Sequence, residues 1–250
     1  MLQQVREDHT VNSIAKENPV LAAMAEGKLS QDQMRKFILQ RHLTAAPFER
    51  LLQRAIQGAR EEHDDDVAEV LEQNLNDERG LGSDGVYEPG LSHASWREDF
   101  STALGLQPQD LEQATPSQGT LEYLNAIEEL IAEGDYVKMA GAIYALERSI
   151  PAEFHRILAG VEKVFPQEFR FSQEWTPEEL VAGVRGRVER ARRYLVDHIH
   201  HDAASHAPDL EEALTDHMSA YALFHAIHGG IDTIIAAKKK FYQGIEYEPE

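Results

Sequence analysis

Apolar residues recur along most of this chain at the three- and four-residue spacing of amphipathic helices. Alternating runs of β-branched residues between turn signals, which would indicate strands, are missing. The pattern therefore predicts an all-α fold. The expected helices span about residues 2–17, 29–56, 63–79, 93–105, 118–133, 135–165, 178–201, 209–228 and 230–243.

Local signals mark helix ends and irregularities. Ser30 followed by Gln33 is the signature of a capping box at the start of a helix. Pro151 lies inside a predicted helix and has no N–H for the carbonyl of Glu147, so we expect a kink there. No linker rich in Pro, Gly or Ser divides the chain, which favours a single domain over residues 1–250.

Composition narrows the classes of partner. The chain has 44 Asp and Glu against 24 Lys and Arg, a net charge of -20, which repels nucleic-acid phosphates and anionic lipids. We therefore expect a small-molecule substrate, and neither a nucleic acid nor a membrane as partner. The absence of cysteine excludes disulfides, thiolate ligands and cysteine nucleophiles. The sequence shows neither a secretory signal nor an apolar run of the roughly 20 residues that span a bilayer, so we expect a cytoplasmic location. It leaves open whether the chain forms a homodimer.

Potential metal ligands are densest in LVDHIHHDAASHAP, residues 195–208, which hold four of the twelve histidines and two aspartates. At 100° per residue, Asp202 lies about 40° and His206 about 80° round the helix from His198, so the three share one face. Imidazole and carboxylate together suit iron, manganese or zinc. The alternative is a solvated helix end, because Pro208 stops the helix nearby.

A second set of ligand-type residues follows at His225, His228 and Asp232. These residues also share a helix face by spacing, but Gly229 and Gly230 weaken the helix between them. We therefore expect this set on a solvated face, with one helix ending before the glycines.

Several acids occur where a carboxylate is costly to bury. Glu49 lies in APFERLL and Glu147 in MAGAIYALERSIPAEF, both among apolar residues. Glu78 ends one predicted helix and His93 begins the next, on either side of a glycine-rich connection over 79–92. The alternative for each acid is an ion pair with a neighbouring arginine, namely Arg50, Arg79 or Arg148.

The order of these features resembles that of the haem-oxygenase-like di-iron oxidases and oxygenases, whose fold is shared with haem oxygenase, thiaminase-type proteins and pyrroloquinoline-quinone synthase. The resemblance covers most of the chain. It is carried by HTVNSIAKENPVLAAMAEGKLSQDQMRKFILQRHLTAAPFE, NLNDERG, SHASWREDFSTALGL, ALERSIPAEF and RRYLVDHIHHDAASH. It implies a single compact helical bundle of the haem-oxygenase-like type, with about seven core helices.

By position, the resemblance implies a centre of two iron ions (Fe) per chain, with O2 as co-substrate. The implied iron ligands are Glu78, His93, Glu147, His198, Asp202 and His206, together with Glu49 as an acid that coordinates in some members only. Of these, Glu78, Glu147 and His198 are the residues that we expect to be catalytic. Many members close with H-x3-D-x2-H, which would put the last ligand at Ser205 and not at His206.

The activity implied by the resemblance is that of an O2-dependent oxidase or oxygenase. Its substrate would be a small organic molecule such as an amino acid, a fatty acid or a similar carboxylate. Arg41, Arg148 and Arg192 are candidates to pair with a substrate carboxylate. The alternative role for these arginines is to balance the charge of an acidic bundle.

Two other functions stay open. One is a haem-binding, haem-oxygenase-like protein that uses His9 as its haem ligand. Glu147 argues against it, because an acid is poorly suited to a haem face. The other is a non-catalytic metal-binding bundle, which would take up metal without having a substrate cavity. A thiaminase-like hydrolase with a cysteine nucleophile is excluded in that form by the lack of cysteine.

Overall fold

The computed structural model describes residues 18–81, 86–87, 92–165, 195, 206–217 and 221–245. In these ranges the named elements are all helices, apart from one isolated bridge that pairs Leu81 with Tyr87. The all-α prediction is therefore confirmed. The helix expected over 2–17 lies outside the described residues, as does the helix over 178–201 except at Leu195.

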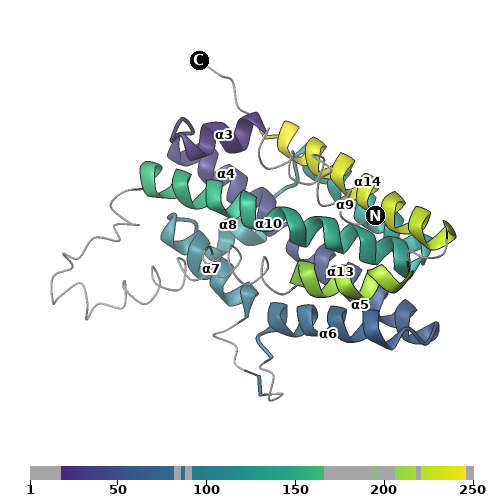
Figure 1. Cartoon of the computed structure of the whole chain (residues 1–250). Helices are drawn as coiled ribbons and strands as arrows, with labels where there is room; N and C mark the ends of the chain where they lie inside the picture. Colours follow the sequence, from purple (N-terminus) through teal and green to yellow (C-terminus); the bar gives the residue numbers. More distant parts are fainter. Residues whose placement is uncertain are drawn as a thin grey trace.

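The described helices follow the predicted order for most of the chain (Figure 1). They are α3 (Pro19–Ala25), α4 (Gln31–His42), α5 (Ala45–Glu61), α6 (Asp65–Arg79), α7 (His93–Ala103), α8 (Pro108–Glu112), α9 (Gln118–Glu133), α10 (Tyr136–Val164), α13 (His206–His217) and α14 (Tyr221–Gln243). Helices α6, α7, α9 and α10 confirm the predicted ranges to within a few residues. The short helices α3 and α8 were not expected.

The prediction of a single helix over 29–56 was wrong, because the helix is interrupted between α4 and α5. Pro47 lacks the N–H that a continuous helix would donate to the carbonyl of Leu43. The Thr44 hydroxyl donates to the Arg41 carbonyl over 2.7 Å, which satisfies an acceptor at the end of α4. The predicted start of α4 is confirmed, since the capping box at Ser30 is present.

The predicted helix break at Gly229 and Gly230 was also wrong, because both glycines lie within α14. The two helices α14 and α10 cross at this point with their backbones close together. A Cβ atom at Gly230 would lie 1.8 Å from the carbonyl oxygen of Lys138, and one at Gly141 would lie 2.4 Å from that of Ile227. The glycines allow backbone contact between the two helices, and this packing outweighs their poor helix propensity.

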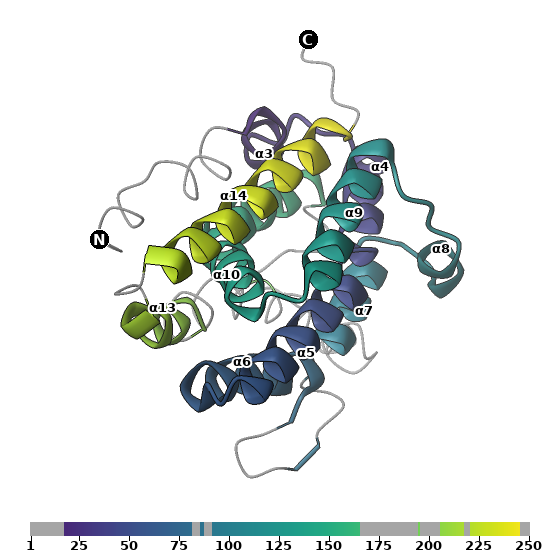
Figure 2. The same ribbon diagram turned by 90° about the vertical axis from the view of Figure 1, so that its right-hand side faces the viewer.

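Helix α10 lies at the centre of the bundle and contacts α3, α5, α13 and α14 (Figures 1 and 2). Around it, α14 also packs on α9, α5 packs on α6 and α9, and α13 packs on α6. Figure 2 shows α8 at the edge of this arrangement. The contacts among α6, α10 and α13 bring polar side chains from three helices together. None of the helices in the described ranges is both long and apolar enough to cross a membrane.

We expect Gly230→Ala to lower the free energy of unfolding by about 1–3 kcal/mol, because its methyl group would overlap the backbone of α10. Gly229→Ala is the matched control. Its methyl group would meet only the flexible end of Lys138, at 3.6 Å, so stability should be unchanged or raised by up to about 1 kcal/mol. Urea denaturation followed by circular dichroism measures both values. Equal effects of the two substitutions would contradict the close crossing.

Candidate metal centre

Helix α6 presents three polar side chains on one face near its C-terminal end. Asn74, Asp77 and Glu78 are spaced by three and four residues, so they lie one above another on the helix. The helix ends at Gly80, which adopts the left-handed conformation with φ of 72°. This face meets α7, α10 and α13, each of which contributes a buried side chain.

Glu78 pairs with two residues of α7. The His93 ring donates from Nδ1 to Oε1 of Glu78 over 2.9 Å, and Nη2 of Arg97 lies 3.4 Å from Oε2. Burial by itself raises the pKa of Glu78, but the attraction of His93, Arg97 and His206 outweighs it and lowers the pKa from 4.5 to about 2. The carboxylate is therefore ionised, and His206 of α13 is close enough to contribute.

Glu147 of α10 is buried with 2% of its surface exposed. Its Oε1 accepts from the Asn74 side-chain amide over 2.9 Å, and its Oε2 lies 3.6 Å from Nδ1 of His206. The other ring nitrogen of His206, Nε2, lies 2.9 Å from Oδ2 of Asp77. His206 thus lies between carboxylates from two helices, and its side chain is 4% exposed.

The chemistry of this donor set fits iron. Carboxylates and imidazoles, without thiolates, are the ligands of non-haem iron. Glu147 forms no ion pair with any Lys or Arg of the described residues, although an isolated buried carboxylate is costly. The buried Oδ1 of Asn74, beside it, has no hydrogen-bond partner in this part of the chain. A cation between these groups would compensate for both.

The described side chains alone do not complete a metal site. Within the described ranges, no three His, Asp or Glu side chains are arranged to hold one ion. They form two neighbouring groups, Glu78 with His93 and Glu147 with His206. The predicted ligands His198 and Asp202 lie outside the described residues, as does the alternative haem ligand His9.

The sequence also named Glu49, a second histidine set and Arg192. Glu49 pairs with Arg79 over 2.6 Å and its side chain is 39% exposed, so it takes the ion pair given as its alternative. In the second histidine set, His225 and Asp232 are exposed, as expected for a solvated face, whereas His228 is only partly exposed and its Nε2 is buried. Arg192 lies outside the described residues.

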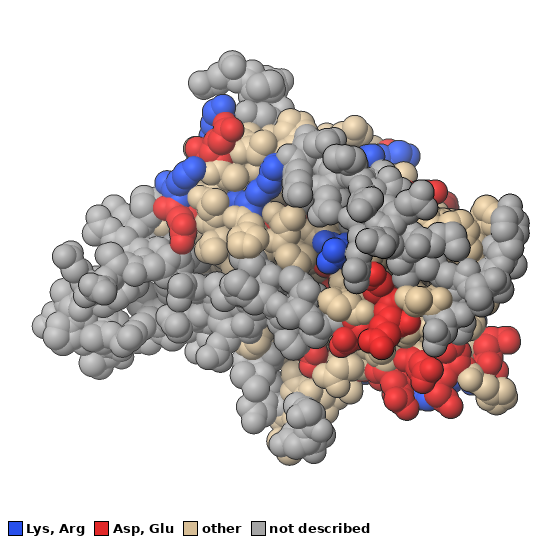
Figure 3. Space-filling view, in the orientation of Figure 1, with Lys and Arg blue, Asp and Glu red and all other residues tan. Residues whose placement is uncertain are grey.

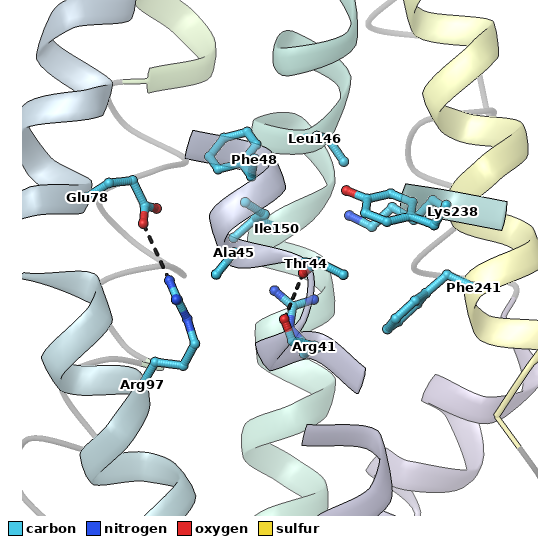
Figure 4. Close-up of a pocket in the computed structure, with 11 residues that line it drawn as sticks. Arg41, Thr44, Ala45, Phe48, Glu78, Arg97, Leu146, Ile150, Lys238 and Phe241 are labelled. Carbon is cyan, nitrogen blue, oxygen red and sulfur yellow. Dashed lines mark hydrogen bonds and ion pairs between the residues drawn. The ribbon is translucent and has the colours of Figure 1, made fainter. Parts of the chain in front are cut away.

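A pocket of about 70 Å³ opens beside Glu78. In Figure 4, Glu78 and Arg97 lie on one side of it and Lys238 and Phe241 on the other. Its remaining lining residues are Arg41, Thr44, Ala45, Phe48, Tyr123, Leu146 and Ile150. The walls therefore combine three cationic side chains and the Glu78 carboxylate with apolar side chains. A volume of this size holds only about five water molecules, so it suits a small ligand.

A buried ionic cluster supports one wall of this pocket. Glu153 of α10 is fully buried and forms ion pairs with Lys238 of α14 and with Arg41 of α4, the latter over 2.9 Å. Lys238 also donates to the Ser149 hydroxyl over 2.6 Å. Burial lowers the pKa of Lys238, and Glu153 opposes that change. The cluster ties three helices together next to the candidate centre.

Sequence reasoning missed Asn74, Asp77, Arg97, Glu153 and Lys238. A signal existed for α6, where NLNDE places three polar residues on one helix face beside the candidate ligand Glu78. No local signal marks Lys238, because KKK at 238–240 reads as an exposed basic end of a helix. Its burial is a property of the packing of α14 on α10.

We expect Lys238→Met to lower the free energy of unfolding by about 3 kcal/mol, because it leaves the buried Glu153 carboxylate without one of its two cations. Lys240→Met is the matched control on the same helix. Lys240 forms an exposed pair with Glu122, so its loss should cost less than about 1 kcal/mol. Chemical denaturation compares the two, and similar effects would show that the Glu153 cluster does not stabilise the fold.

The lowered pKa of Glu78 predicts an acid dependence of stability. Its ionised form stabilises the metal-free protein above the ordinary pKa of 4.5, and this stabilisation is lost as the pH falls through about 2. Over that window, wild type should lose about 3 kcal/mol more than Glu78→Gln. Thermal unfolding measured at several pH values tests this, and parallel losses in both proteins would refute the pairing of Glu78 with His93.

Solved structures with the same fold are found across nearly the whole chain. A TenA homologue from Pseudomonas syringae pv. tomato gives a TM-score of 0.72 at 13% identity and covers 97% of this chain and 90% of its own. A CADD-like protein of unknown function from Nostoc punctiforme gives 0.69 at 20% identity and covers 97% and 92%. At these identities the likeness shows the fold alone, which is the predicted haem-oxygenase-like one. No curated protein matches the chain.

A family described as iron-containing redox enzyme matches residues 35–238. The match spans most of the sequence and includes both groups of carboxylates and imidazoles, Glu78 with His93 and Glu147 with His206. The chain belongs to this family of iron-containing redox enzymes and has the haem-oxygenase-like fold.

Proposed function

We propose that this chain is a non-haem di-iron enzyme that uses dioxygen to oxidise a small organic carboxylate. The observation that carries the proposal is that the buried His93, Glu147 and His206 and the partly buried Glu78 lie in one region beside a small pocket. Glu78 belongs both to this group of side chains and to the pocket wall, since it pairs with His93 and lines the pocket. A substrate in the pocket would therefore lie next to the metal.

These residues would hold two iron ions, with Glu78 and His93 on one side and Glu147 and His206 on the other. The resemblance adds His198 and Asp202 as further ligands. Ferrous iron in such a setting supplies electrons to dioxygen, while the protein supplies geometry and a site from which water is excluded. Carboxylate-rich ligation, as here, stabilises oxidised iron.

The pocket supports an anionic substrate. Arg41 and Lys238 line one part of it and Arg97 another, so a carboxylate would meet cationic groups from three helices. Phe48, Leu146 and other apolar lining residues would pack against the rest of the molecule and exclude water. The small volume favours a short acid over a long-chain one.

The surface around α6 is consistent with cation uptake. Acidic side chains gather on the part of the face in Figure 3 that α6 and α13 occupy in Figure 1. On α6, Asp65, Asp66 and Glu69 are exposed. Such a surface raises the local concentration of divalent cations.

We expect the metal-free chain to bind about two ferrous ions under anaerobic conditions, as in other carboxylate-bridged bundles. Glu147→Gln should lose specific binding of at least one ion, because the amide cannot replace the buried carboxylate. Glu69→Gln, the same change at an exposed position of α6, is the matched control and should bind as wild type does. Iron binding is followed by titration and Mössbauer spectroscopy.

An oxygen electrode then tests catalysis with pairs of small carboxylic acids and their neutral amides. Faster oxygen consumption with an acid and not with its amide is the expected result. Uptake of iron with no oxygen use beyond oxidation of that iron would indicate a non-catalytic metal-binding bundle. Absence of specific iron binding would refute the di-iron proposal and make haem binding through His9 the next test.

A further inference from the structure

Asp77 lies next to Glu78 on α6 and points to a different partner. Its Oδ2 contacts Nε2 of His206 at 2.9 Å, whereas Glu78 contacts His93. Two adjacent carboxylates of one helix thus each hold one imidazole. Neither the family pattern nor the sequence had assigned Asp77 a role.

The pairing with Asp77 determines how His206 can act. An ionised carboxylate only accepts hydrogen bonds, so with Asp77 ionised Nε2 of His206 carries a proton and donates a hydrogen bond to Asp77. When the ring is neutral, its lone pair is therefore on Nδ1, which lies 3.6 Å from Oε2 of Glu147. In the protonated ring a proton on Nδ1 can satisfy this contact, and in the neutral ring a metal ion can take the place of that proton.

The separation of these two atoms suits a metal ion. At 3.6 Å, Nδ1 of His206 and Oε2 of Glu147 are close enough that both could bind the same ion. A carboxylate that accepts from the far nitrogen of a metal-bound histidine is a recurrent device, because it fixes the tautomer and orientation of the ring.

The same contact accounts for the position of His206 in the chain. The family pattern would place the last ligand at Ser205, whereas the histidine comes one residue later. In the structure His206 is the first residue of α13, between α6 and α10. We propose that Asp77 is a positioning residue that turns the displaced His206 so that its Nδ1, together with Glu147, binds one of the two metal ions. This inference rests on the di-iron function proposed above.

The first test measures binding of Co²⁺, a spectroscopic substitute for ferrous iron, to the metal-free full-length chain. Asp77→Asn keeps the shape of the side chain but removes its charge. We expect the weaker of two Co²⁺ sites to lose affinity by about 10- to 100-fold, the usual loss for an outer partner of a ligand histidine. Asp66→Asn, the same change at an exposed position of α6, should bind Co²⁺ as wild type does.

A double-mutant cycle separates positioning from a general effect on the fold. If Asp77 acts only through His206, Asp77→Asn should have no further effect on Co²⁺ affinity in a His206→Gln background. Additive losses would overturn the inference, as would full Co²⁺ affinity in Asp77→Asn. If wild type binds no Co²⁺ or ferrous iron specifically, the proposed function fails and this inference fails with it.

A second measurement identifies the metal-bound nitrogen of His206 in the wild-type chain. In the Co²⁺-loaded protein, ring protons that are not adjacent to the bound nitrogen give sharp, strongly shifted NMR signals. Binding through Nδ1 leaves two such protons on His206, on Nε2 and Cδ2, whereas binding through Nε2 leaves one. We expect the two-signal pattern, assigned by its loss in His206→Gln. A single signal from His206 would overturn the inference.

Discussion

The burial of the Glu147 carboxylate in the middle of α10 is the constraint on which the rest of the site depends. A charged group with 2% of its surface exposed costs several kcal/mol unless other groups compensate for it. The compensation comes from Asn74 on α6 and His206 on α13, so both helices must pack on α10 in one particular register. The glycine crossing of α14 holds α10 from another direction, through Gly141 and Gly230.

Helix α10 carries a second buried carboxylate, Glu153, six residues after Glu147. The two carboxylates differ in the charge of the groups that they contact. Glu153 is paired with two full cations, Arg41 and Lys238, so it is neutralised within the protein itself. Glu147 has no such partner among the described residues and faces an amide and an imidazole. The first arrangement stabilises the fold and shapes the pocket. The second leaves negative charge to be balanced by a bound cation.

Much of the fold could be predicted because it depends on local patterns. The helical periodicity located α6, α7, α9 and α10, and the capping box located the start of α4. The errors arose where tertiary contacts decide. The glycines at 229 and 230 indicate a helix break by propensity, but they are used for close packing against α10. Pro47 separates α4 from α5 inside an apolar pattern that otherwise reads as continuous.

The candidate site was predictable only in part, for a similar reason. Acids in apolar surroundings and the order of His, Asp and Glu pointed to Glu78, His93, Glu147 and His206. The partners that orient these groups could not be found in this way, because Asp77 and Lys238 occur in charged stretches typical of solvent-exposed helix surface. Only the packing of α6 against α13, and of α14 against α10, shows that they are directed inward.

The most direct test of the account is anomalous X-ray diffraction at the iron edge from crystals of the full-length chain loaded with ferrous iron under anaerobic conditions. The account predicts two anomalous peaks within bonding distance of buried side chains, one at Glu78 and His93 and the other at Glu147 and His206. Peaks confined to the acidic surface of α6, with Glu147 and His206 still in direct contact, would contradict it.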